Sequence, residues 1–112
     1  MSKYEHINTK DLKNLIETKA TIIILDARSK EWDDGRRIPG ATSLVFDASP
    51  SLYEQAIPNK NTLIAVYCGG PQCPAGPKLA ENLVTAGYTN VVEYSGGIQE
   101  WADINNYPIE RV

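Results

Sequence analysis

The sequence is poor in metal-binding side chains and has no basic cluster. It contains one histidine and two cysteines among 112 residues, and neither cysteine belongs to a C-x-x-C pair, so the usual ligand sets of a zinc site are missing. We therefore expect no metal and no cofactor. A net charge of −3 gives no electrostatic basis for binding nucleic acid.

Long apolar runs are also absent. None approaches the ~18 residues that cross a bilayer, and the first residues lack the charged, apolar and small-residue succession of a signal peptide. We expect a cytoplasmic protein without a membrane partner, in which the cysteines are thiols rather than a secreted disulfide framework. A chain of 112 residues with 42% hydrophobic content predicts one domain over residues 1–112.

The sequence does contain short, continuous apolar runs rich in β-branched residues. Such runs are typical of strands buried on both faces of a parallel sheet. They are residues 21–26 (TIIILD), 43–46 (SLVF), 63–67 (LIAVY) and 91–94 (VVEY).

Two helices are predicted between these runs. The segment 8–19 repeats apolar residues at helical spacing, and Asn8 or Thr9 is a suitable N-cap. A second helix is expected to start at Pro77 and to end at Gly87. The alternation predicts an α/β fold, with a central parallel sheet of about five strands and helices on both faces.

Cys68 follows the run 63–67 and precedes the second helix. In open α/β sheets, ligands bind beyond the carboxyl ends of the strands, near helix N-termini. There the helix dipole and free amides favour a thiolate, and Gly69 and Gly70 let the backbone curl around an anion. Cys68 is therefore a candidate nucleophile; the alternative is a buried free cysteine that packs like a small apolar side chain.

Two other anion-binding loops are excluded by spacing. A P-loop needs G-x-x-x-x-G-K-[ST], but Gly70 and Gly76 are one residue too far apart and Pro77 precedes Lys78. A cysteine phosphatase loop needs an arginine six residues after the cysteine, where this chain has Pro74. Phosphate-ester hydrolysis therefore lacks its main clamp.

Three motifs, in order along the chain, resemble the rhodanese family. Residues 24–42 (ILDARSKEWDDGRRIPGAT) are similar to D-x-R-x-x-x-E-[YF]-x-x-G-H-I-P-G-A through Asp26, Arg28, Trp32, Gly35, Ile38, Pro39, Gly40 and Ala41. Residues 91–110 (VVEYSGGIQEWADINNYPIE) resemble the closing segment L-x-G-G-x-x-x-W-x-x-x-G-Y-P through Gly96, Gly97, Trp101, Tyr107 and Pro108. With LIAVYC and KLAENL, the resemblance covers nearly the whole chain.

The resemblance implies a sulfurtransferase or sulfane-sulfur carrier with Cys68 as the persulfide-bearing residue. Its partners would be a small sulfur donor, such as thiosulfate, and a thiol, another nucleophile or an acceptor protein. A persulfide anion needs amide donors around its terminal sulfur. The residues expected to bind the substrate are Gly69, Gly70, Gln72, Cys73, Ala75, Gly76 and Lys78.

The loop departs from the family pattern C-x-x-G-x-R. Cys73 stands where the arginine would fall, and Pro71, Pro74 and Pro77 remove three backbone donors. The loop should be stiffer and poorer in positive charge than usual, which argues against efficient use of thiosulfate. Lys78 could face the loop or the solvent.

Cys73 allows a second chemistry. If it attacks a persulfide on Cys68, it expels sulfide and leaves a disulfide, so a thiol-disulfide redox protein is one alternative. A catalytically weak binding or regulatory module is another, because the arginine is missing. We expect Cys73 to pack inward and not to pair with Cys68.

Four side chains from the motifs are expected to serve structure. Asp26 and Arg28 fit an ion pair at the end of a strand, and Trp32 and Trp101 fit core or rim packing. The turn at Gly40 is expected to need restricted or positive φ.

Overall fold

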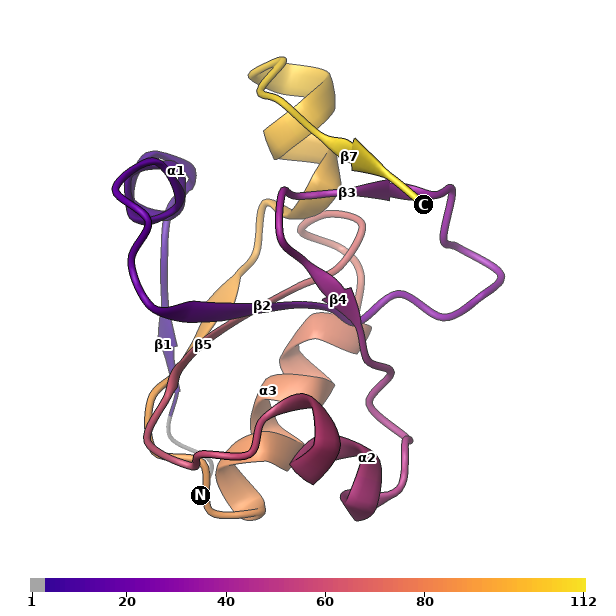
Figure 1. Cartoon of the computed structure of the whole chain (residues 1–112). Helices are drawn as coiled ribbons and strands as arrows, with labels where there is room; N and C mark the ends of the chain where they lie inside the picture. Colours follow the sequence, from indigo (N-terminus) through magenta and orange to yellow (C-terminus); the bar gives the residue numbers. More distant parts are fainter. Residues whose placement is uncertain (1–3) are drawn as a thin grey trace.

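The fold is a parallel five-stranded sheet with helices on both faces, which confirms the predicted fold class. In this computed structural model, which describes residues 4–112, the strands lie in the order β1-β6-β5-β2-β4 and every neighbouring pair is parallel (Figure 1). The elements are β1 (Glu5–His6), α1 (Thr9–Glu17), β2 (Ile22–Asp26), β3 (Arg36–Arg37), β4 (Thr42–Ser43), α2 (Pro50–Ala56), β5 (Leu63–Tyr67), α3 (Ala75–Thr85), β6 (Val91–Tyr94), the π-helix η1 (Gln99–Ile104) and β7 (Glu110–Arg111).

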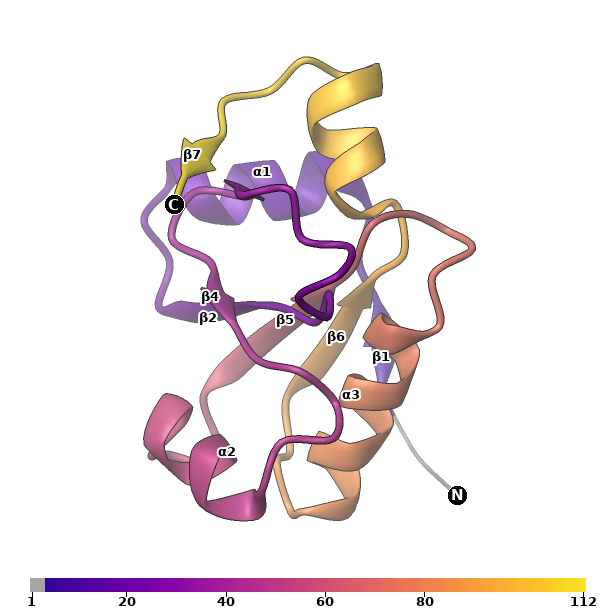
Figure 2. The same cartoon turned by 90° about the vertical axis from the view of Figure 1, so that its right-hand side faces the viewer.

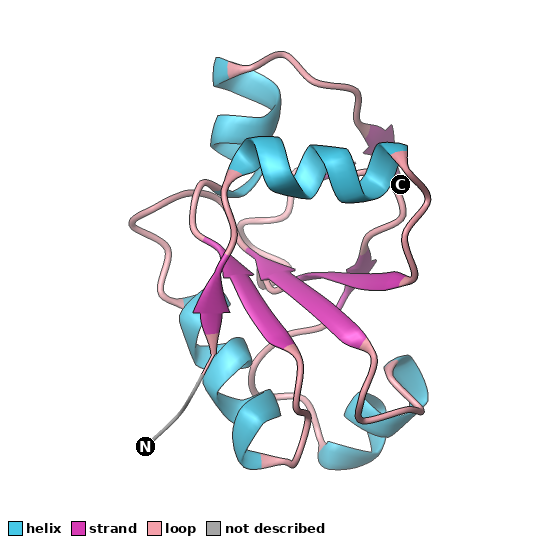
Figure 3. Cartoon of the chain, turned by 90° about the vertical axis from the view of Figure 1, so that its left-hand side faces the viewer, coloured by secondary structure: helices cyan, strands magenta, loops and turns pink. Residues whose placement is uncertain are grey.

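The side chains of each central strand alternate between two cores. Ala65 and Tyr67 of β5 pack with α1 and η1 on one face, whereas Ile64 and Val66 pack with α2 and α3 on the other. Figures 2 and 3 show these two pairs of helices above and below the sheet. Burial on both faces explains why the strand sequences are continuously apolar.

Three of the four predicted strands agree with the structure, and the fourth is shorter. β2, β5 and β6 coincide with the predicted runs to within one residue. The run 43–46 was expected to be a strand, but β4 ends at Ser43 because β2, the strand it pairs with, ends at Asp26. Phe46 instead packs beside the core that α2 and α3 cover.

Both predicted helices are present, and the start of the second is corrected. Helix α1 has Asn8 as its N-cap. Helix α3 begins at Ala75 rather than at Pro77. Pro77 is tolerated because it lies in the first turn, where backbone N–H groups have no acceptor within the helix. Gly87 follows the helix with φ 102°, as its position predicted.

No sequence pattern predicted the small antiparallel pair β3–β7, which joins Arg36 to Arg111 and Arg37 to Glu110. The predicted turn at Gly40 has φ 84°, so its need for positive φ is confirmed. No helix within residues 4–112 is long and apolar enough to cross a membrane.

Candidate functional site

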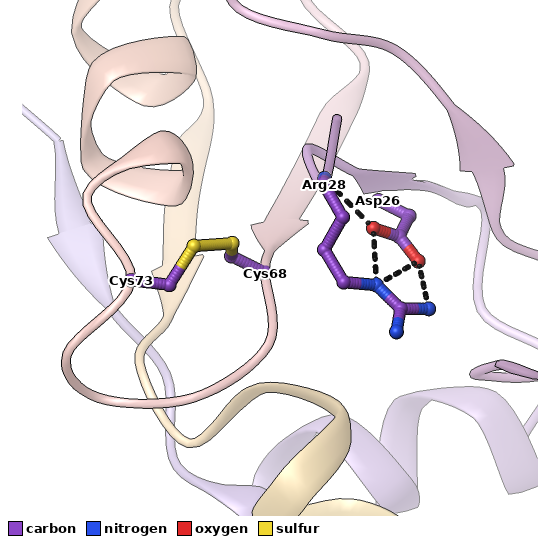
Figure 4. Close-up of a disulfide and its surroundings, with 4 residues drawn as sticks. All are labelled: Asp26, Arg28, Cys68 and Cys73. Atoms are coloured by element: carbon purple, nitrogen blue, oxygen red, sulfur yellow. Dashed lines mark hydrogen bonds and ion pairs between the residues drawn. A yellow bond between two sulfur atoms is a disulfide. The ribbon is translucent and has the colours of Figure 1, made fainter. Parts of the chain in front are cut away.

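Cys68 lies directly after β5, at the carboxyl end of a central strand, as the sequence predicted. It is only 3% exposed. The loop that follows rises from the sheet and returns to the start of α3 (Figure 4). The site therefore sits between the end of the sheet and the N-terminus of a helix.

Cys68 and Cys73 form a disulfide, so the expectation that Cys73 packs inward without pairing is wrong. The Cys73 amide donates to the Gly70 carbonyl at 3.1 Å, which closes a turn with Pro71 at its second position. Proline favours that position because its fixed φ matches the turn. Pro71 therefore helps to fold the loop back, and the two Cα atoms lie 6.2 Å apart, within the usual range for a disulfide.

The start of η1 packs against the cysteine loop and donates hydrogen bonds to it. The amides of Ile98 and Gln99 donate to the carbonyls of Cys68 and Gly69 at 3.0 and 2.9 Å. Gly97 has φ 64°, and a Cβ there would lie 2.6 Å from the Cys68 carbonyl oxygen. The close approach requires glycine at this position, which explains part of the closing motif.

Helix α3 presents its first residues to the back of Cys68. A Cβ on Gly76 would lie 3.6 Å from the Cys68 Cβ and 3.3 Å from Oε2 of Glu93. Glu93 is buried, accepts a hydrogen bond from the Ser95 hydroxyl at 2.7 Å and pairs with His6 at 3.0 Å. Gly76 therefore packs between the cysteine and a buried carboxylate. No sequence pattern predicted this cluster.

The predicted pair of Asp26 and Arg28 is a buried structural ion pair. The Arg28 guanidinium donates to Asp26 at 2.8 Å and to Asp34 at 3.0 Å, and in Figure 4 it points away from the disulfide. Burial disfavours its charge, but these hydrogen bonds and charges outweigh burial and raise the pKa of Arg28. Burial acts to raise the pKa of Asp34, but hydrogen bonds from Arg36 and Arg28 outweigh this effect and lower the pKa to about 2.

Two hollows adjoin the disulfide and contain several of the predicted substrate-binding residues. One, of about 210 Å³, is lined by both cysteines and Ala75, and an adjoining one of about 630 Å³ by both cysteines, Gly69 and Gln72. Gly70 lies on the other side of the loop, in a hollow that it shares with Gln99.

Two predicted residues lie away from these hollows. Gly76 is buried behind Cys68. Lys78 is exposed and lines neither of the hollows at the disulfide; its ammonium lies 5.1 Å from the centre of the Phe46 ring. Of the two orientations that the sequence allows for Lys78, the structure has the solvent-exposed one, with the ammonium near the Phe46 ring.

The sequence missed two aromatic residues of the site. Trp101 is buried in the core, as expected, but Trp32 is 76% exposed and lines both hollows at the disulfide. Of the two expectations for Trp32, packing in the core is therefore wrong, whereas a place at the rim agrees with its position beside the hollows. Phe46 lines the smaller hollow, because the end of the expected strand 43–46 turns towards α3. The acidic residues around Trp32 were the available signal that its segment is solvent-exposed.

Comparisons with known proteins agree with this geometry. The chain is 28% identical, over 105 residues, to the adenylyltransferase and sulfurtransferase UBA4 of Candida albicans; the match covers 87% of this chain and 23% of that protein, so the chain spans about a quarter of that relative. The crystal structure of the BH2092 protein from Bacillus halodurans superposes with a TM-score of 0.84 at 28% identity, covering 96% of this chain and 77% of that one.

The fold is also shared with more distant proteins. The rhodanese-like domain of the Anabaena protein Alr3790 gives a TM-score of 0.77 at 24% identity, covering 98% of this chain and 81% of that one. The sequence model of the rhodanese-like domain matches residues 8–104, which include both cysteines, the whole motif at 24–42 and the closing motif as far as Trp101. The chain therefore belongs to the rhodanese-like domain family, whose relatives include sulfurtransferases.

Proposed function

We propose that the protein transfers sulfane sulfur through a persulfide on Cys68. The observation that carries the proposal is the position of Cys68 after a central strand, on a loop that leads into the N-terminus of α3. The helix dipole and the free amides of Ala75 and Gly76 favour an anion at this place. The match to a relative named a sulfurtransferase supports the same reaction.

The reaction begins from the reduced loop. An external dithiol or two thiols supply the two electrons that open the Cys68–Cys73 disulfide. The Cys68 thiolate then attacks the outer sulfur of the donor, the sulfur–sulfur bond of the donor breaks, and its remaining part leaves with the electron pair. Cys68 now carries a persulfide anion, whose outer sulfur is transferred to a nucleophilic acceptor when that acceptor breaks the new bond.

Mass spectrometry of the reduced protein tests this proposal. After exposure to a sulfur donor and removal of excess reagent, the protein should gain the mass of one sulfur atom, and peptide mapping should locate it on Cys68. Cys73→Ala keeps the nucleophile and should also gain sulfur, whereas Cys68→Ser should gain none. The absence of added sulfur in both wild type and Cys73→Ala, with each donor tried, would contradict the proposal.

The disulfide supports a second candidate function, a thiol-disulfide reaction that consumes the persulfide. Cys73 is already within bonding geometry of Cys68 and is held there by the turn from Gly70. Its thiolate would attack the inner sulfur of the Cys68 persulfide, form the disulfide and expel hydrosulfide. The sulfane sulfur is thereby reduced to sulfide while the two cysteines are oxidised.

The two candidates differ in their products. If Cys73 resolves the persulfide, reduced wild type should release one sulfide per chain and accumulate the Cys68–Cys73 disulfide, whereas Cys73→Ala should stop at the persulfide. If wild type keeps its persulfide as long as Cys73→Ala does, the protein is a sulfur carrier and Cys73 does not resolve the persulfide.

A further inference from the structure

A buried carboxylate lies behind Cys68. Glu93, the charged residue of β6, is only 4% exposed, although glutamate is seldom fully buried unless it is paired. A Cβ on Gly76 would lie 3.3 Å from Oε2 of Glu93 and 3.6 Å from the Cβ of Cys68. Little more than the width of one methyl group therefore separates the carboxylate from the candidate nucleophile.

The surroundings of Glu93 favour its charged form. His6 lies opposite Glu93 in the pairing of β1 with β6, and its Nδ1 is 3.0 Å from Oε1 of Glu93. The Ser95 hydroxyl donates to the same oxygen at 2.7 Å. Oε2 instead faces Gly76 in the first turn of α3, where the helix dipole has its positive end. Hydrogen-bond donors and positive charge both favour a carboxylate over a carboxylic acid.

The other charged groups beside Cys68 have partners or lie in solvent. The Arg28 guanidinium is bound to Asp26 and Asp34. Asp47 lines the smaller hollow at the disulfide, but it is exposed, so water and salt weaken its effect on Cys68. The positive end of α3 and the carboxylate of Glu93 therefore act most directly on the charge of Cys68.

The groups around Glu93 leave most of its negative charge uncompensated. The side chain of His6 is 66% exposed, so solvent weakens its attraction to Glu93. Tyr4 is neutral, because burial, followed by the charges of Glu93 and Glu81, raises the pKa of its hydroxyl. Glu81 itself is exposed on α3.

We propose that Glu93 controls the reactivity of Cys68 by disfavouring its thiolate and thereby favouring its disulfide with Cys73. A like charge nearby destabilises the thiolate, whereas the disulfide is uncharged and escapes this repulsion. The N-terminus of α3 favours an anion on Cys68, and Glu93 opposes part of that effect from behind. Glu93 acts through Cys68 and is a positioning residue, not a catalytic one. The inference does not depend on sulfur transfer, because it concerns only the ionisation and oxidation of Cys68.

The redox equilibrium that Glu93 affects is balanced with glutathione as the reductant. Two glutathione thiols give two electrons and two protons to the Cys68–Cys73 disulfide and become glutathione disulfide. Where the pH is high enough, Cys68 then releases its proton to solvent, and the resulting thiolate is repelled by Glu93. Reduction is therefore less favourable than it would be beside a neutral side chain.

The first test is the pH profile of alkylation by iodoacetamide in reduced Cys73→Ala protein, in which Cys68 is the remaining thiol. Glu93→Gln keeps the shape of the side chain and removes its charge, so the pH of half-maximal rate should fall by about 1 pH unit. Glu81→Gln is the matched control, because it removes the same charge from the exposed side of α3. It should leave the profile unchanged.

The second test is the ratio of dithiol to disulfide in glutathione buffers, with Cys73 present. About 1 pH unit above the alkylation midpoint, Glu93→Gln should raise this ratio about tenfold. About 2 pH units below the midpoint, the ratio should equal that of wild type, because Cys68 is then protonated in both proteins. A purely structural role of Glu93 would change the ratio equally at both pH values.

A second pair of variants covers the case in which Glu93→Gln does not fold. Glu93→Asp and Glu93→Asn are equal in size and differ in charge, so the aspartate variant should have the higher alkylation midpoint. Thermal unfolding shows which variants are folded at the assay temperature. The inference is overturned if the neutral member of a folded pair has the same or a higher midpoint, or if the change in the disulfide ratio does not depend on pH.

These measurements use no sulfur donor, so they fail independently of the proposed function. If Cys68 gains no sulfur from any donor, the proposed function fails, and the alkylation profile still decides whether Glu93 acts on Cys68. If Glu93→Gln leaves the profile unchanged, this inference fails, and sulfur gain on Cys68 still decides the proposed function.

Discussion

Replacing Gly97 by alanine should displace the cysteine loop, because Gly97 touches the backbone of that loop. The new Cβ would lie 2.6 Å from the carbonyl oxygen of Cys68, 2.7 Å from the carbonyl carbon of Gly69 and 2.7 Å from the amide nitrogen of Gly70. These are backbone atoms, so no side-chain rotation relieves the overlap. Either the loop or the start of η1 must move.

The cost can be estimated from two contributions. Alanine at the positive φ of Gly97 costs about 1–2 kcal/mol, and forcing extra volume into a packed contact costs about 1–3 kcal/mol. Gly97→Ala should therefore lower the free energy of unfolding by about 2–5 kcal/mol. Gly40→Ala is the matched control, because Gly40 has φ 84° but no atom within 4 Å of its Cβ position; it should cost only about 1–2 kcal/mol.

Thermal unfolding followed by circular dichroism, with reductant present throughout, measures the difference. Since 1 kcal/mol corresponds to about 4 °C in a domain of this size, Tm should fall by about 8–20 °C for Gly97→Ala and about 4–8 °C for Gly40→Ala. Below both transitions, only Gly97→Ala should slow sulfur gain at Cys68. Equal Tm values and equal rates for the two variants would refute the close approach on which this reasoning rests.

Three further predictions concern the disulfide and the ion pairs. Reduction of the Cys68–Cys73 bond, which closes a short loop with a sequence separation of 5, should lower the free energy of unfolding by about 2 kcal/mol; calorimetry should detect this in wild type but find no response to reductant in Cys73→Ala. The pKa of Asp34 in the folded protein is lowered to about 2, so the stabilisation from its carboxylate is complete above about pH 4 and is lost as pH falls towards 2. Below pH 4 the free energy of unfolding should therefore fall less steeply with pH in Asp34→Asn than in wild type. Parallel curves would contradict this. Arg28→Met should cost about 3–5 kcal/mol in urea unfolding, because Asp26, 1% exposed, loses the guanidinium that donates to it at 2.8 Å and keeps only the more distant Arg37 at 3.6 Å. A loss below about 1 kcal/mol would contradict the ion pair's structural role.

The sequence by itself determined the central strands β2, β5 and β6 and the place of Cys68 at the end of β5. β2 and β5 are continuous β-branched or apolar runs, and such runs are stable only when both faces of the strand are covered. The position of Cys68 after β5 then follows from the topology of parallel sheets, in which loops at the carboxyl ends meet helix N-termini. Local patterns were sufficient for these features because each depends on neighbouring residues.

The tertiary structure alone decided which side chains surround Cys68. The direction of the Arg28 guanidinium depends on Asp34 and on the Arg36 carbonyl, and the support from Gly97 comes from a segment far along the chain. Trp32 is a large aromatic side chain of the kind that usually packs in a core, but it is exposed beside the disulfide. These outcomes depend on how distant segments pack against one another, and that packing is not encoded in the spacing of residues within any one of them.

The pairing of the cysteines lies between these two cases. The sequence places Cys73 five positions after Cys68, in a loop expected to be stiff, and predicts that the two do not pair. In the structure Pro71 occupies a turn that its fixed φ favours, and the hydrogen bond from Cys73 to Gly70 closes the loop. The sequence supplied both thiols, whereas the path of the backbone between β5 and α3 brought them together.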